Sequence, residues 1–81
     1  MEIDKDKIDD TVLALLYLTT FNDKYSVRAW KGHDWESLKR LYEKDLISDP
    51  KSKAKSVVLT EEGAKLSEKL FKVLFEKKTE Q

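Results

Sequence analysis

Seven basic side chains are the first candidates for chemistry in this sequence, and that chemistry would be the binding of phosphate groups. A short segment without acidic residues carries three of them at alternate positions, Lys51, Lys53 and Lys55. The other four are Lys39, Arg40, Arg28 and Lys31. Lysine and arginine side chains neutralise phosphates and release their counterions. These seven residues therefore form the predicted nucleic-acid-binding set.

Two of these groups also have an ordinary structural explanation. Lysines at alternate positions of a β-hairpin point to one face and can protect an exposed edge from aggregation. The sequence leaves that role and phosphate binding evenly balanced. Glu36 precedes Arg40 by four residues on a predicted helix. Glu43 follows Lys39 at the same spacing, and such pairs favour an ordinary salt-bridged helix surface.

Two tryptophans accompany the remaining cations. Trp30 lies between Ala29 and Lys31, and Trp35 follows five residues later. Aromatic rings among cations can stack nucleic acid bases. Tryptophans of a small domain more often pack into its core, with an arginine covering one face of the ring. We therefore expect Trp30 and Trp35 to be core residues.

The sequence contains no recognisable catalytic or metal-binding constellation. It has no cysteine and one histidine, His33, which precedes Asp34. A lone histidine does not make a typical zinc site, and neither a glycine-rich loop nor an activated serine accompanies it. We interpret His33 as a turn residue beside a helix cap. The prediction is a protein that is not an enzyme and that uses no cofactor, metal or small-molecule substrate.

Length and composition define the scaffold. The 81 residues form one predicted domain, 1–81, and the 40% hydrophobic content excludes intrinsic disorder. Sixteen basic and 16 acidic residues give a net charge of zero, less basic than a strongly DNA-binding domain. The longest apolar run, residues 12–18, is shorter than the ~20 residues that span a membrane. The acidic start is unlike a secretory signal, so we expect a cytoplasmic protein without a membrane partner.

Three helices are expected to position the candidate residues. Apolar spacing predicts the first over roughly residues 4–20, capped by Asp4 or Asp6. A second helix is predicted from the cap Asp34 to about residue 44, and a third begins after the cap Thr60.

The predicted strands are short. Residues 22–24 are typical of a turn, and residues 26–31 of a short strand. Two β-rich runs, 47–49 and 55–59, flank a segment that begins with Pro50. Because proline cannot donate to a β-ladder, the pattern predicts a β-hairpin with Pro50 at its tip.

This order of helix, short strand, helix, basic hairpin and helix is that of a winged helix-turn-helix. Residues 38–47 (LKRLYEKDLI) and 57–63 (VVLTEEG) resemble the tail of MarR-type and PadR-type regulators, with their pattern L-x-x-L-x-x-K-G-L-I, wing and L-T-x-x-G. The resemblance implies an α+β winged helix-like fold, with two long helices flanking a shorter one and a hairpin wing. Asp45 replaces the usual glycine, and residues 22–33 leave little room for the middle helix.

A wider resemblance covers most of the chain. Residues 28–32 (RAWKG), 34–35 (DW), 46–50 (LISDP) and 53–63 (KAKSVVLTEEG) resemble an uncharacterised family of small bacterial proteins, a domain of unknown function. The resemblance implies a bacterial source and a shared fold, without an activity.

Two functions are consistent with these observations. The leading prediction is a small DNA-binding or transcription-associated protein whose partner is double-stranded DNA. In regulators of this fold, the helix before the wing enters the major groove and wing cations contact phosphates. The alternative is a protein-interaction or dimerisation module that uses the same fold without binding DNA. The neutral net charge favours the alternative.

A homodimer is predicted through the first and last helices. Below ~80 residues, one core rarely supplies more than ~3–5 kcal/mol without a disulfide, a metal or a partner chain. The apolar surface of both helices also looks too wide for one monomer. The predicted interface residues are Val12, Leu16, Phe71, Leu74 and Phe75. The alternative is a monomer in which the two helices cover each other.

Overall fold

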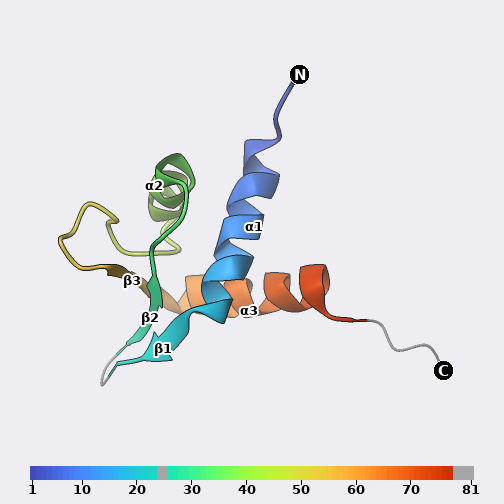
Figure 1. The fold of residues 1–81 in the computed structure, drawn as a ribbon. Coiled ribbons are helices and arrows are strands. Elements are labelled where there is room, and N and C mark those ends of the chain that lie inside the picture. The colour runs from blue at the N-terminus through green and yellow to red at the C-terminus, as the bar shows by residue number, and fades with distance from the viewer. Residues whose placement is uncertain (24–25, 78–81) are drawn as a thin grey trace.

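A computed structural model of the chain describes residues 1–23 and 26–77 (Figure 1). Within them the fold is α+β, with three helices and one antiparallel sheet of strand order β1-β2-β3. The elements are α1 (Lys5–Leu18), β1 (Thr20–Asn22), β2 (Val27–Trp30), α2 (Trp35–Glu43), β3 (Ser56–Leu59) and α3 (Glu61–Phe75). The three helices and the short strand at β2 are confirmed, whereas β1 was not predicted. Every helix among the described residues is too short or too polar to cross a membrane.

Each helix begins at a predicted capping residue. Asp4, Asp34 and Thr60 all accept a hydrogen bond from the backbone N–H group three residues further along the chain. These bonds satisfy N–H groups that have no partner inside the helix. Helix α1 ends two residues earlier than predicted, because the hydroxyls of Thr19 and Thr20 donate back to carbonyl groups of its last turn.

The predicted pairing of residues 47–49 with residues 55–59 is present only at its base. Strand β3 pairs along its whole length with β2 on one edge. Its other edge meets the segment after α2 through a bridge between Ile47 and Leu59 and through hydrogen bonds between Ser48 and Val58. The pairing with β2 aligns Ala29 with Val57, both fully buried, which places an apolar stripe of each strand on the core side. Residues 49–55 are therefore a loop between α2 and β3.

A shorter hairpin, formed by β1 and β2, precedes α2. Asn22 lies in β1 opposite Val27, and the Asp23 N–H group donates to the Ser26 carbonyl at 2.8 Å. The predicted turn at residues 22–24 therefore begins after Asn22, and Lys24 lies outside the described residues.

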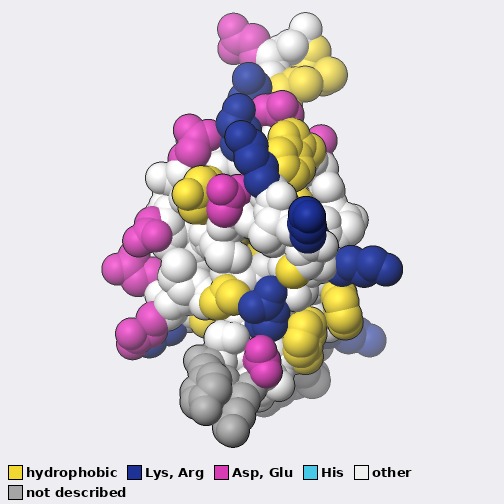
Figure 2. Space-filling view, turned by 90° about the vertical axis from the view of Figure 1, so that its left-hand side faces the viewer, with side chains coloured by type: hydrophobic (Ala, Val, Ile, Leu, Met, Phe, Trp, Pro, Cys, Tyr) yellow, Lys and Arg dark blue, Asp and Glu magenta, His cyan; other side chains and the backbone are white. Residues whose placement is uncertain are grey.

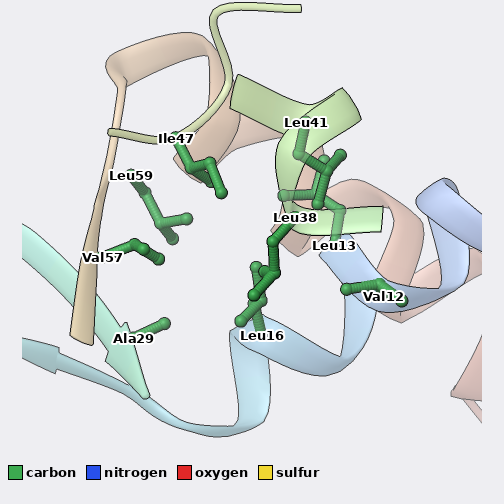
Figure 3. Close-up of a cluster of buried hydrophobic side chains, with 9 residues drawn as sticks. All are labelled: Val12, Leu13, Leu16, Ala29, Leu38, Leu41, Ile47, Val57 and Leu59. Carbon is green, nitrogen blue, oxygen red and sulfur yellow. The ribbon is translucent and has the colours of Figure 1, made fainter. Parts of the chain in front are cut away.

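The core lies between α1, α2 and one face of the sheet (Figure 3). Its buried apolar residues are Val12, Leu13, Leu16, Ala29, Leu38, Leu41, Ile47, Val57 and Leu59. The placement of Val12 and Leu16 in this cluster makes them unavailable to a second subunit. The part of the predicted dimer interface on α1 is therefore wrong.

Both tryptophans lie outside this core, contrary to the prediction. Trp30 is 52% exposed and Trp35 is 44% exposed. Side chains of a strand alternate between faces, so the buried neighbour Ala29 directs Trp30 outward. Trp35 is the first residue of α2, whose inward positions belong to Leu38 and Leu41.

The start of α3 rests directly on the chain that leaves α2. Asp45 follows that helix in the left-handed region, with φ 61°, a conformation that glycine adopts most readily. The Thr60 hydroxyl donates to the Asp45 carbonyl at 2.8 Å, and the Thr60 N–H group donates to the Leu46 carbonyl at 3.0 Å. A Cβ atom on Gly63 would lie 1.9 Å from the Leu46 oxygen. Only glycine allows this approach.

We expect Gly63→Ala to destabilise the fold by about 3 kcal/mol or more, the upper range for overpacking, because the added methyl group meets backbone. Gly32→Ala is the matched control, since a Cβ atom there has no neighbour within 4 Å. That control should leave stability unchanged or raise it by about 0.4–1 kcal/mol. Urea unfolding of both variants measures the difference, and equal stabilities would refute the close approach.

Candidate nucleic-acid interface

The loop of residues 49–55 is built by contacts that fix its shape. The Lys31 ammonium group donates to the carbonyls of Pro50 at 2.8 Å and Ser52 at 2.7 Å. The Lys31 N–H group donates to the Lys55 carbonyl at 3.1 Å. At the start of the loop, the Asp49 carboxylate accepts a hydrogen bond from the backbone N–H of Lys51 at 2.9 Å. Lys31 therefore holds the loop to the end of β2.

Three predicted lysines project from this loop. Lys51, Lys53 and Lys55 are all exposed, and within residues 1–23 and 26–77 none of them forms an ion pair. Because the loop is not a strand, their alternate spacing does not place them on one face. The role of protecting a strand edge therefore does not apply to Lys51 and Lys53. These side chains leave three positive charges in solvent.

Helix α2 adds a fourth cation and two aromatic rings beside the loop. Lys39 is exposed, and its predicted pairing with Glu43 is absent from the ion pairs of the described chain. A groove of about 120 Å³ separates the helix from the loop. It is lined by Trp35, Lys39, Tyr42, Glu43, Asp49, Pro50 and Lys51. Rings and Pro50 make the walls of the groove mostly apolar, and its rim carries both basic and acidic side chains.

Acidic and basic side chains gather on different parts of the surface on this side of the molecule (Figure 2). Acidic side chains gather along the left edge of the view, and basic and hydrophobic side chains lie next to one another on the right. An anion approaching the basic part would meet cations and apolar surface together.

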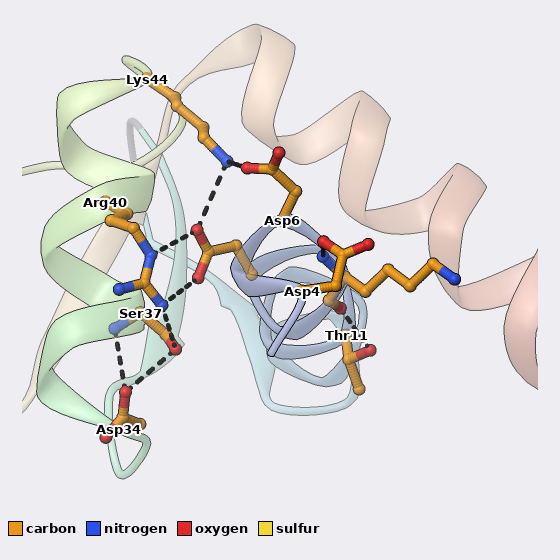
Figure 4. A network of polar contacts seen from close by, with 9 residues as sticks. Asp4, Asp6, Thr11, Asp34, Ser37, Arg40 and Lys44 are labelled. Carbon is orange, nitrogen blue, oxygen red and sulfur yellow. Dashed lines mark hydrogen bonds and ion pairs between the residues drawn. The ribbon is translucent and has the colours of Figure 1, made fainter. Parts of the chain in front are cut away.

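Arg40 does not belong to this exposed set. Its Nε donates to Oδ2 of Asp9 at 2.7 Å, and its Nη2 donates to Oδ1 at 2.8 Å (Figure 4). The Lys44 ammonium group lies 3.4 Å from the same carboxylate and 3.3 Å from Asp6. The predicted partner of Arg40 was Glu36, so that pairing is wrong. A fully buried carboxylate on α1 attracts Arg40 more strongly than an exposed acid on its own helix does.

The protonation of Asp9 follows from this geometry. Burial favours the neutral acid, but the hydrogen bonds and positive charges of Arg40 and Lys44 outweigh it, and they lower the pKa of Asp9. The hydrogen bond to Asp9 is the main reason that the pKa of Arg40 is raised. For Lys44, burial works against the charge, while Asp6 and Asp9 raise its pKa. The three groups are charged together at neutral pH.

Arg28 lies on the sheet, and part of its guanidinium group is already hydrogen-bonded within the protein. Its Nε donates to the Ser56 hydroxyl at 2.8 Å, across β2 and β3. The seven predicted residues thus divide into two groups. Lys39, Lys51, Lys53 and Lys55 are free to contact a ligand, whereas Arg28, Lys31 and Arg40 hold parts of the fold in place. Exposed aromatic side chains such as Tyr42 were missed, because helical spacing gave no sign that this face stays in solvent.

Comparisons with known proteins agree with the wider resemblance. Residues 4–77 match the family described as a domain of unknown function, DUF6429. The chain belongs to this family. It is 59% identical over 75 residues to the uncharacterized protein y4hR of Sinorhizobium fredii, a match that covers 93% of this chain and 97% of that protein. No solved structure matches the chain at a significant level. The resemblance to MarR-type and PadR-type regulators stays a prediction.

These matches extend along almost the whole DUF6429 chain, so its relative in Sinorhizobium fredii is expected to share the fold. Neither the family description nor the name of the relative states an activity. The surfaces of the molecule therefore carry the argument about function.

We expect Asp9→Asn to lower the free energy of unfolding at pH 7 by about 3 kcal/mol, the low end for breaking a buried ion pair, because Arg40 stays partly exposed. The pKa of Asp9 is lowered in the folded state, so the unfolded state binds more protons in acid. Wild-type stability should therefore decrease as the pH falls through the ordinary value of 3.8 and below it. Asp9→Asn should flatten this decrease.

Denaturant unfolding from pH 7 down to about pH 2 measures both effects. Asp10→Asn, an exposed neighbour on α1, is the matched control and should change little. Equal pH dependence in the wild type and Asp9→Asn would show that the ion pair does not stabilise the fold.

Proposed function

We propose that this protein is a small bacterial DNA-binding or transcription-associated protein with a winged helix-like layout. Strand β2 pairs with β3, Ile47 extends the sheet, and the loop of residues 49–55 occupies the position of a wing after α2. A cytoplasmic location, where the chromosome lies, is part of this proposal.

The observation that carries the proposal is the group of four lysines without an acidic partner in the described chain. Lys39, Lys51, Lys53 and Lys55 are exposed on α2 and on a loop whose shape is fixed by Lys31. Cations held in solvent near one another are suited to phosphates, which dominate affinity for DNA and do not depend on sequence. No other group of exposed lysines was predicted to act together.

The charge on α2 limits what this surface would recognise. Glu36 and Glu43 are exposed on the same helix as Lys39, and acids near the phosphates weaken binding. The paired Arg40 is not available to reach a base edge. We therefore propose weak binding to duplex DNA, dominated by the loop and strongly dependent on salt.

The triple change of Lys51, Lys53 and Lys55 to Ala should weaken binding to random duplex DNA at low salt. It should also flatten the salt dependence by up to ~3 units, because each phosphate contact contributes about 0.9 to the slope. The matched control changes three lysines that are exposed elsewhere, Lys65, Lys69 and Lys77, to Ala. A mobility assay over a series of salt concentrations separates the two variants. If the two behave alike, the loop is not the binding surface, and if the wild type does not bind, the proposal fails.

A second candidate, an interaction module that forms a homodimer, is favoured by the apolar end of α3. Val73 is 72% exposed, Leu74 is 48% exposed and Phe75 is 46% exposed. Val73 and Leu74 line a groove between α1 and α3 together with Leu70 and Thr11. Phe71 is half-buried against Tyr17, with ring centroids 5.0 Å apart, so it supports the monomer. An exposed apolar strip of this kind is typical of an interaction site.

We expect light scattering at micromolar concentration to give twice the monomer mass of 9.5 kDa. Phe75→Asp should return the mass to that of the monomer, because an unpaired carboxylate in a buried interface is costly. Tyr42→Asp, a change at a similarly exposed aromatic residue on α2, should leave the mass unchanged. A mass of 9.5 kDa that does not change on concentration would exclude the dimer.

A further inference from the structure

The sheet has an outer face whose side chains alternate with those that enter the core. Ala29, Val57 and Leu59 face the core. The intervening positions of the three strands belong to the outer face, since side chains alternate along a strand. They are Phe21, Arg28, Trp30, Ser56 and Val58. These five positions carry one cation, Arg28, and Asp23 follows at the β1 end, where its backbone pairs with Ser26.

Two aromatic rings form a continuous surface on this outer face. Phe21 lies in β1 and Trp30 lies in β2, and their ring centroids are 4.9 Å apart with a tilt of 31°. Trp30 nevertheless remains 52% exposed. A ring that is fixed by a neighbour and open on its other side can receive another planar ring at little cost in conformational entropy.

The cation on the outer face is held in place. Arg28 donates from Nε to the Ser56 hydroxyl at 2.8 Å, and from Nη2 to the Ser56 carbonyl at 3.4 Å. Arg28 also stands opposite Phe21 in the β1–β2 register, next to the aromatic pair. A guanidinium group in this position can stack on a base or pair with a phosphate.

The loop that carries three of the free lysines begins beyond the Trp30 end of this face. Trp30 pairs with Ser56, and the Lys31 N–H group donates to the Lys55 carbonyl one step further along the same two strands. The loop that carries Lys51, Lys53 and Lys55 therefore leaves the sheet next to Trp30. Arg28, then Trp30, then the loop with its lysines follow one another along the sheet.

We propose that the outer face of the sheet binds single-stranded nucleic acid, with a base stacked on the Phe21–Trp30 pair and the backbone phosphates on the loop lysines. The inference shares the loop with the proposed function and goes beyond it in the kind of nucleic acid bound. Bases of a duplex are stacked on one another, so only an unpaired strand can offer a base to the rings. The exposed lysines of the adjoining loop, which form no ion pair in the described chain, favour a polyanion over a second copy of this neutral chain.

Fluorescence titration of the full chain with an oligothymidine strand tests the inference, with a duplex of equal length in parallel at low salt. A Trp35→Phe background reports on Trp30 alone, and its emission should be quenched by the single strand. In the otherwise wild-type chain, Trp30→Ala should weaken single-strand binding by about five-fold to a hundred-fold, the loss expected for one stacked base. Its affinity for the duplex should change by less than about two-fold, because the duplex uses the loop.

Phe75→Ala is the matched control, since Phe75 is a similarly exposed aromatic residue that lies on α3, away from the sheet and the loop. It should bind the single strand as the wild type does. Trp30→Leu keeps an apolar cover over the strands and removes the stacking surface, so it should lose affinity even if Trp30→Ala does not fold. Trp30→Phe should retain most of the affinity.

The outcomes separate this inference from the proposed function. Equal single-strand affinities for the wild type, Trp30→Leu and Phe75→Ala would overturn the inference. Duplex binding that depends on the loop lysines would still support the proposed function. If the wild type binds the single strand but not the duplex, the proposed function is overturned and the inference stands. Failure of the wild type to bind either probe would overturn both. A fall in molecular mass caused by Trp30→Leu would assign the face to a second copy of the chain, which also overturns the inference.

Discussion

The buried carboxylate of Asp9 constrains the arrangement of α1 and α2 more than any other single group. A charge that is fully removed from water is tolerated only when it is paired and hydrogen-bonded. Arg40 and Lys44 meet this requirement from α2, one helical turn apart, and so fix one side of that helix against α1. Leu38 and Leu41 then face the core.

This constraint also decides what α2 offers to solvent. Once the cations at 40 and 44 face α1, the outward positions are left to Trp35, Lys39 and Tyr42 beside the loop. The helix that would serve as a recognition helix therefore presents one free cation and two rings, not a row of basic side chains. An interface built on such a helix depends on the loop and the sheet for most of its charge.

Local features of the fold were predictable from the sequence because local interactions determine them. The caps Asp4, Asp34 and Thr60 act on N–H groups three residues away, and each appears where the pattern indicated. The Asp9 ion pair was missed, although a signal existed. Asp9 stands three, four and seven residues before Val12, Leu13 and Leu16, which is a core position of α1. A charged residue in that stripe requires a cation from another element.

Pairing between distant segments was not predictable in the same way. The prediction used only the edge of β3 that faces residues 47–49. The other edge pairs with β2, and this pairing aligns the buried residues Ala29 and Val57 across the sheet. The exposure of Trp30 follows from that same register. The sequence named seven candidate cations by residue type. Which of them are exposed and which hold other parts of the chain became clear only from the three-dimensional contacts.

The two hydrogen bonds from the Lys31 ammonium group have a thermodynamic consequence for any ligand of the loop. A surface loop that is free in the unbound protein must lose conformational freedom when it binds, and this loss weakens the affinity. Here the carbonyls of Pro50 and Ser52 are already held to β2. The entropy of ordering residues 50–52 is lost when the chain folds, so that a ligand need immobilise only the lysine side chains.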